Sequence, residues 1–171
     1  MATEEQTLYE SSLINLQSEA VVRGGQRLTV PNLKITKLGF WLQKSSLPTG
    51  TLTLRIRKID DAIILTKDWG DAEDVPTEIT YLEVEFDTPA VIDEEVRVLA
   101  EFSGGDPTNH IKMYGTEPSV KPDEHFTYYS TSWSFLEGFD MAYIYTYGDE
   151  EVGLENKSAN MASELVAAGL I

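Results

Sequence analysis

Apolar and polar residues alternate along the middle of the chain, from about residue 20 to residue 148. In one such segment Leu52, Leu54 and Ile56 are separated by threonine and arginine. A period of two places successive side chains on opposite faces of a β-strand, so that one face packs into a core. We therefore expect these three apolar side chains to be buried, and Arg55 and Arg57 to face water.

Turn-forming residues divide this alternating region into short segments. Leu47-Pro48-Thr49-Gly50 and Ser103-Gly104-Gly105-Asp106 are two of the dividing stretches, and both are rich in residues that favour turns. Many short alternating segments separated by turns are typical of antiparallel sandwiches and barrels. The pattern therefore predicts an all-β fold.

The alternation changes phase once within a single segment. Leu33 and Ile35 are odd-numbered, whereas Phe40 and Leu42 are even-numbered. One extra residue in a strand shifts the pattern in this way, so we expect a β-bulge near Lys37.

The length of 171 residues suits one domain, which we divide into three parts. Residues 1–19 form an N-terminal arm or edge strand, residues 20–150 the β-sandwich, and residues 151–171 a short C-terminal helical tail. A helix this short is marginal alone, so it docks either on its own sandwich or on a neighbouring subunit. We expect interface contacts from apolar side chains of both terminal parts, namely Leu13, Ile14, Leu16, Met161, Leu165 and Val166.

Charge and composition narrow the choice of partner and location. The chain carries 29 acidic and 13 basic residues, giving a net charge of −16, which repels phosphate backbones and anionic lipids. We expect neither nucleic acid nor a membrane as partner. The N-terminus does not resemble a secretory signal, so we expect synthesis in the cytoplasm without a signal peptide. Cysteine is absent, which removes thiolate chemistry.

Candidate catalytic residues are few. His110 and His125 are the two histidines, and neither lies in a Gly-x-Ser-x-Gly or His-Glu-x-x-His motif. We expect no catalytic residues and no enzymatic activity. A hydrolase that uses acidic residues is a third alternative, and it requires two carboxylates converging in a cleft.

Acidic residues are concentrated in one loop, where hard oxygen ligands favour calcium. We expect no cofactor other than a structural Ca²⁺ ion, although the spacing is not that of an EF-hand. The candidate ligands are Asp68, Asp71, Glu73 and Asp74.

Aromatic residues are the stronger candidates for binding. Trp41 is out of phase with the apolar residues around it, and Tyr129 and Trp133 lie in a segment crowded with aromatic residues. Exposed aromatic rings bind sugars or other proteins, whereas buried ones fill the core. We take these three residues as candidate ligand-binding residues.

Two turn motifs and their flanking strands carry a family resemblance. The matching stretches are Gly39 to Lys44, Leu47 to Leu52, Leu82 to Phe86, Glu101 to Asp106 with Asn109, Trp133, Asp140, and Tyr145 to Gly148. In these stretches the chain resembles a jelly-roll-like domain of phage, archaeal and bacterial surface and virion structural proteins, which is similar to carbohydrate-binding modules. The resemblance implies an antiparallel jelly-roll β-sandwich that serves attachment or assembly.

These features favour a non-enzymatic structural protein of a virion, as a capsid decoration, spike or tail-associated protein. We expect it at the virion or particle surface, forming a homo-oligomer and packing on neighbouring subunits and other virion or surface proteins. The alternative is a carbohydrate-binding or host-attachment module that binds a glycan through exposed aromatic residues.

Overall fold

The structure, a computed structural model, describes residues 1–148. Its strands pair in antiparallel ladders and no α-helix occurs among these residues, which confirms the expected all-β class. The elements are β1 (Ala2–Gln6), β2 (Ser11–Leu16), β3 (Arg23–Ser45), β4 (Thr51–Lys58), β5 (Ile63–Asp71), the 3₁₀ turn η1 (Ala72–Asp74), β6 (Thr80–Glu101), β7 (His110–Thr116), β8 (His125–Tyr129), β9 (Trp133–Leu136), β10 (Asp140–Met141) and β11 (Tyr143–Gly148).

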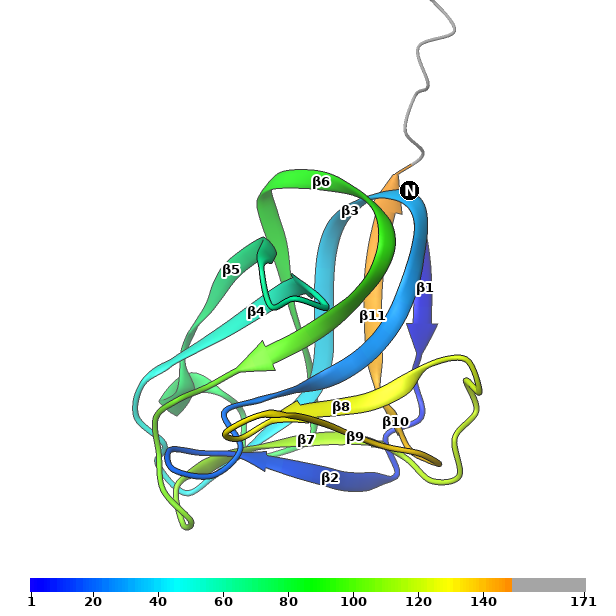
Figure 1. The fold of residues 1–171 in the computed structure, drawn as a ribbon. Helices are drawn as coiled ribbons and strands as arrows, with labels where there is room; N and C mark the ends of the chain where they lie inside the picture. The colour runs from blue at the N-terminus through cyan, green and yellow to red at the C-terminus, as the bar shows by residue number, and fades with distance from the viewer. Residues whose placement is uncertain (149–171) are drawn as a thin grey trace, which may run out of the picture.

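Two long strands, β3 and β6, join the two layers of a sandwich. The second half of β3 and the first half of β6 form one layer with β11 and β1. The first half of β3 and the second half of β6 form the other layer with β4, β5, β8 and β9. Figure 1 shows both long strands arching over the top of the molecule as they pass from one layer to the other.

The two long strands bend at irregularities in their pairing. In the pairing with β11, Thr36 is an extra residue of β3 between Ile35 and Lys37, which confirms the bulge expected near Lys37. The register with β6 shifts at the same place. It also shifts between Val30 and Leu33. Extra residues bend a strand and increase its twist, so these shifts allow continuous strands to serve two layers.

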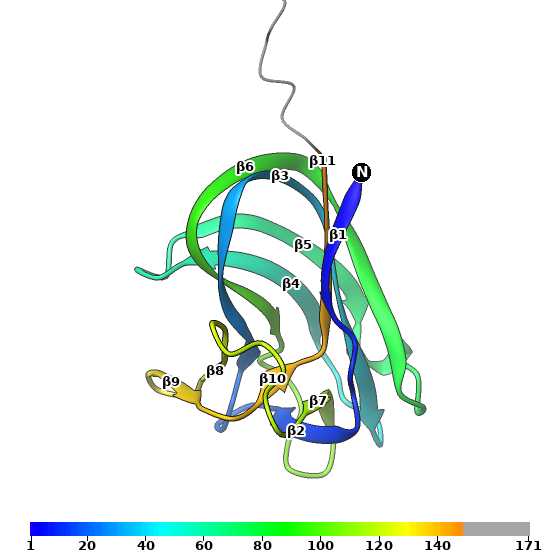
Figure 2. The same cartoon turned by 90° about the vertical axis from the view of Figure 1, so that its right-hand side faces the viewer.

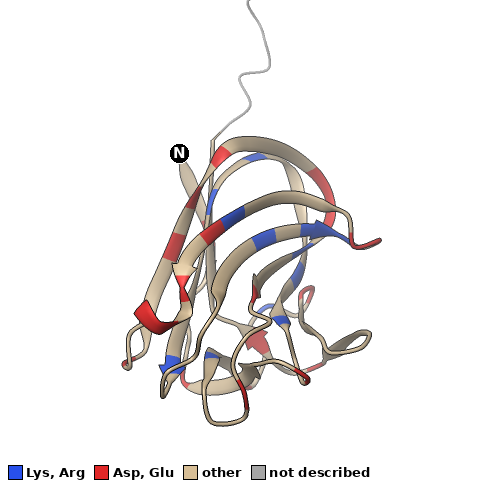
Figure 3. Ribbon diagram, turned by 90° about the vertical axis from the view of Figure 1, so that its left-hand side faces the viewer, with Lys and Arg blue, Asp and Glu red and all other residues tan. Residues whose placement is uncertain are grey.

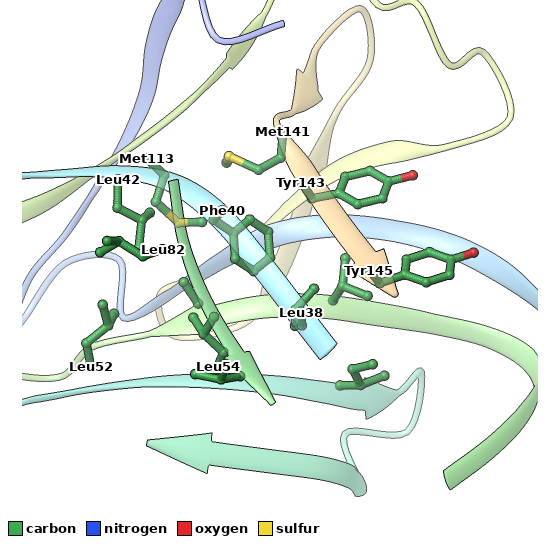
Figure 4. Close-up of a cluster of buried hydrophobic side chains, with 14 of the residues drawn as sticks. Leu38, Phe40, Leu42, Leu52, Leu54, Leu82, Met113, Met141, Tyr143 and Tyr145 are labelled. Atoms are coloured by element: carbon green, nitrogen blue, oxygen red, sulfur yellow. The ribbon is translucent and has the colours of Figure 1, made fainter. Parts of the chain in front are cut away.

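The core lies between the layers, and each strand contributes its alternate residues to it, the even-numbered ones in β4 and the odd-numbered ones in β7 and β11. Leu52, Leu54 and Ile56 of β4 are fully buried, as expected from the alternation. Figure 4 shows Leu52 and Leu54 of β4 on one side of the interior and Phe40 of β3 and Tyr143 of β11 on the other. The apolar alternation therefore identified the inner face of the sandwich.

The expectation for the opposite face of β4 was partly wrong. Arg57 is only 6% exposed, and so is Arg97 of β6 beside it. Alternation assigns side chains to two faces of a sheet, but it does not show whether the polar face is covered. The outer face of this layer therefore holds buried charges.

The N-terminal segment packs on its own sandwich. Strand β1 is an edge strand on β11, and β2 pairs with β7. Leu16 is fully buried, and Leu13 and Ile14 pack against the core. Figure 2 shows β1 running down the molecule from the N-terminus and β2 lying across its bottom.

The expected C-terminal helix, residues 151–171 with Met161, Leu165 and Val166, lies outside the described residues, as do residues 149 and 150. Within residues 1–148 no helix is long and apolar enough to span a membrane.

One buried carboxylate holds a long loop against the core. Asp140 is fully buried. Its Oδ2 accepts hydrogen bonds from the Ser119 hydroxyl and from the backbone N–H groups of Val120 and Lys121, at 2.6–2.9 Å. Its Oδ1 accepts one from Gln26 Nε2 at 2.8 Å. A single side chain thus pairs four donors from two distant parts of the chain.

We predict that Asp140→Ala destabilises the protein by about 3–5 kcal/mol, because four donors lose a charged acceptor at a buried site. Urea unfolding followed by tryptophan fluorescence measures this change. Ser119→Ala is the control and should cost about 1 kcal/mol, since it removes one donor and leaves the carboxylate paired. Equal effects of the two substitutions would contradict the role given to Asp140.

Candidate functional site

All five arginines of the chain lie on the outer face of one layer. They are Arg23 and Arg27 on β3, Arg55 and Arg57 on β4, and Arg97 on β6. They occupy odd-numbered positions on three neighbouring strands. The even-numbered positions of these strands in this layer face the core. Acidic positions, by contrast, are spread over the strands and loops of the whole fold (Figure 3). We call these five residues the arginine face.

The strand register brings three of these arginines into one row. Arg27 is directly opposite Arg97, and Arg97 is directly opposite Arg57. Like charges directly opposite each other on a sheet are destabilising. If these three arginines only stabilise the fold, carboxylates must offset the repulsion between them.

Glu101 is the central counter-ion of the arginine face. Its side chain is 8% exposed and accepts hydrogen bonds from Arg57 Nε at 2.6 Å and from Arg57 Nη2 at 3.2 Å. Arg55 Nη1 also donates to it, and Arg23 Nε lies 3.8 Å away. One buried carboxylate thus neutralises part of the charge of three guanidinium groups.

Two further carboxylates lie at the rim of the face. Glu95 accepts two parallel hydrogen bonds from Arg27, at 2.7 and 2.8 Å. These bonds hold the pKa of Glu95 below its usual value. Asp61, in the turn after β4, accepts hydrogen bonds from Arg23 Nη1 at 3.0 and 3.2 Å.

Arg97 differs from the other four arginines because no carboxylate among residues 1–148 forms an ion pair with it. Its Nη1 donates to the carbonyl oxygens of Lys58 and Ile59, and its Nε is buried without a hydrogen-bond partner. Burial, followed by the charge of Arg27, lowers the pKa of Arg97 below its usual value. A buried cation without a counter-ion is costly.

The β8–β9 hairpin brings aromatic rings over this face. The Trp133 ring centroid lies 4.1 Å from the Arg97 guanidinium carbon, and the Tyr129 centroid lies 4.5 Å from that of Arg23. Strands β9 and β6 are three places apart in the layer, which corresponds to about 14 Å in a flat sheet. The layer is therefore strongly curved, and the long side chains of β6 and β9 meet on its concave side.

Two pockets open on this side of the layer. One, of about 140 Å³, is lined by Arg27, Arg97, Thr127, Trp133, Ser134 and Phe135. The other, of about 430 Å³, is lined by Val22, Arg23, Thr51, Thr53, Arg55, Glu101, Phe102 and Ser103. Pockets that hold small molecules measure about 300–1,000 Å³. The larger pocket is within this range, and the smaller one suits a single functional group.

The three aromatic residues selected from the sequence fall in two places. Tyr129 and Trp133 contact each other edge to face at 5.2 Å, beside the arginine face. Trp41 lies on the other layer, stacked on Tyr9 at 5.3 Å and beside Tyr81 at 4.8 Å. The structure therefore joins two of the three candidates and separates the third.

The four candidate calcium ligands are not gathered into a site. Asp68 is on β5 and accepts a hydrogen bond from the Thr53 hydroxyl at 2.7 Å, Asp71 ends β5, and Glu73 and Asp74 lie in η1. Within residues 1–148 no three histidine, aspartate or glutamate side chains are arranged to hold a metal ion. Calcium binding stays a prediction from the sequence.

The histidines are also far from an acid–base arrangement. His110 Nδ1 lies 3.1 Å from the Pro107 carbonyl oxygen, and its Nε2 is buried without a partner. His125 pairs with Arg27 in the strand register and contacts the Phe135 ring. The carboxylates that converge on the outer face, Glu101 and Asp61, are paired with arginine and not with each other.

Sequence analysis missed the arginine face. Its signal was the odd-numbered spacing of the arginines, at 23 and 27, at 55 and 57, and at 97, within alternating segments. That spacing places them on the same side of their strands, but only the strand order brings the strands together. No protein-family model matches the sequence, and no curated protein matches it either.

We predict stability effects of different size for two substitutions on this face. Glu101→Gln should destabilise the protein by about 3 kcal/mol, because three arginines lose their buried counter-ion. Arg97→Met should stay within about 1 kcal/mol of the wild type, because it removes a charge that has no counter-ion and keeps apolar contact with Trp133. Urea unfolding at neutral pH compares the two variants. A loss of 3 kcal/mol or more for Arg97→Met would mean that Arg97 serves stability.

Proposed function

We propose that this protein is a non-enzymatic attachment module that binds carbohydrate at the arginine face, beside Tyr129 and Trp133. One observation carries the proposal: aromatic rings and an arginine without a carboxylate partner border the same small pocket. Arginine forks donate pairs of hydrogen bonds to sugar oxygens, and aromatic rings pack against the apolar faces of sugar rings. The two kinds of side chain together suit a glycan.

The exposure of the aromatic residues supports this proposal. Phe135 is 54% exposed and Leu136 is 42% exposed, although both lie on a strand. Tyr129 and Trp133 are half-buried. Aromatic rings that only filled the core would be covered, so this hairpin offers an apolar surface to a ligand.

The jelly-roll arrangement and the particle-surface location are part of the same proposal. Two antiparallel layers with a shared core support the jelly-roll assignment. Attachment of a virion to its host is a setting in which a glycan-binding sandwich without enzymatic activity is useful.

Assembly with other copies of the chain is the second candidate function. It was favoured in part because both termini needed packing partners, and residues 11–16 have theirs within the chain. The remaining support is at an edge of the sandwich. Strand β1 has a single neighbour among the described strands, and Leu8 and Tyr9 after it are 44% and 43% exposed. Edge strands with apolar neighbours pair readily with another chain.

The attachment proposal predicts that Trp133→Ala lowers glycan affinity by at least about tenfold, because a ring that packs against the sugar is lost. A glycan array with labelled protein identifies the ligands, and calorimetry on a ligand from the array measures the change. Trp41→Ala is the matched control, since Trp41 lies on the other layer, and it should bind normally. An array without ligands, or equal loss in both variants, would refute glycan binding at this face.

The assembly candidate predicts a different result. Sedimentation velocity should show a mass that increases with protein concentration, and Tyr9→Lys should lower it by placing a charge beside the β1 edge. Leu47→Lys is the control, because Leu47 is 69% exposed in a loop away from that edge. A monomer at every concentration, or the same response to both substitutions, would argue against assembly through β1.

A further inference from the structure

We propose that the ligand of the arginine face is an acidic glycan, and that Arg97 binds its carboxylate or sulfate group. This inference rests on the proposed function and specifies the class of sugar. Three features of the face carry it: its local charge, its unpaired donors and the position of its aromatic rings.

The local charge of the face is opposite to that of the whole molecule. The face holds five guanidinium groups, and three carboxylates, Asp61, Glu95 and Glu101, pair with four of them. A fourth carboxylate, Asp68 on β5, is hydrogen-bonded to Thr53 and forms no ion pair with these arginines. The face therefore has a positive surplus, while the chain as a whole carries −16.

Arg97, the arginine without a carboxylate partner, lies at the centre of the row of arginines. Arg97 is the member of the row with arginine on both sides, opposite Arg27 and Arg57. A structural ion-pair network would place a carboxylate at this central position. Here the carboxylates are at the ends, and the central cation lines the pocket of about 140 Å³.

A second unpaired donor belongs to another residue that lines the same pocket. Trp133 Nε1 is buried without a hydrogen-bond partner, as is Arg97 Nε. Buried donors are almost always paired, so two orphaned donors from residues that line one pocket indicate a missing acceptor. An anionic oxygen accepts hydrogen bonds from several donors and neutralises the surplus charge.

The aromatic rings favour a sugar over an acidic peptide. Phe135 lines the pocket and is 54% exposed, which offers a flat surface to a ring beside the anion site. The net charge of −16 also repels densely charged polyanions at long range. A glycan with one acidic group per few sugar rings satisfies both conditions.

Calorimetry with matched tetrasaccharides tests the inference. Hyaluronan supplies carboxylates, and chitin oligosaccharide is neutral with the same N-acetylglucosamine ring. Chondroitin sulfate supplies carboxylates and sulfate, with N-acetylgalactosamine as its amino sugar. We expect the acidic sugars to bind at least about tenfold more tightly than the neutral one, because the neutral sugar leaves Arg97 without a counter-ion. Binding of hyaluronan identifies the carboxylate as sufficient, and binding of chondroitin sulfate but not of unsulfated chondroitin identifies the sulfate.

Variants of Arg97 show whether this residue is the anion site. Arg97→Met should lower the affinity for the acidic sugar about tenfold or more and leave that for the neutral sugar unchanged. Arg97→Lys keeps the charge without the planar fork and should show a smaller loss. Lys37→Met is the control, because Lys37 pairs with Glu83 on the other layer, and it should bind like the wild type. Circular dichroism melting confirms that each variant is folded.

The outcomes separate this inference from the proposed function. Neutral sugars that bind as tightly as acidic ones, with an unchanged Arg97→Met variant, would overturn the acidic-glycan inference and leave glycan attachment intact. Failure of every glycan on the array would overturn both. Binding of polyglutamate instead of any acidic sugar would also overturn the inference, and it would identify an acidic protein segment as the partner.

Discussion

The pairing of β3 with β6 determines both the core and the candidate site. These strands pair from Arg23 opposite Glu101 to Leu42 opposite Thr80, and they pass together from one layer to the other. Their even-numbered residues in the second layer, such as Val98, face the core. Their odd-numbered residues there, including Arg27 and Arg97, face outward. One pairing register therefore packs the sandwich and aligns the arginines.

The register that packs the core also brings like charges together on the outer face. The register puts Arg27, Arg97 and Arg57 in a row, which is unfavourable without counter-ions. Glu101 lies in another row of the same face, between Arg23 and Thr53, and its carboxylate pairs with Arg57. The guanidinium group of Arg97 contacts carbonyl oxygens and the Trp133 ring instead of a carboxylate. Such uncompensated strain at a pocket is typical of binding sites, where the ligand completes the hydrogen bonding.

The sequence predicted the inner half of the molecule well, because its signals are local. Alternation located Leu52, Leu54 and Ile56 in the core, and a phase change located the bulge near Lys37. The outer face depends on strand order and on the curl of the β8–β9 hairpin, which bring together residues distant in sequence. No local pattern distinguishes Arg57, which is buried, from an arginine that faces water. For the same reason Trp41 was grouped with Tyr129 and Trp133, although it stacks on Tyr9 in the other layer.

Net charge and local charge have different consequences in this protein. A total of −16 governs long-range encounters, and it disfavours nucleic acid and other dense polyanions. Screening in physiological salt limits this effect to about 8 Å, so a small ligand at the pocket responds mainly to the groups that line it. The residues that line it include Arg27, Arg97 and Trp133, and the last two each carry a buried donor without a partner. Under the acidic-glycan proposal, the net charge repels an anionic group at a distance, and the positive surplus of the arginine face stabilises it at the pocket.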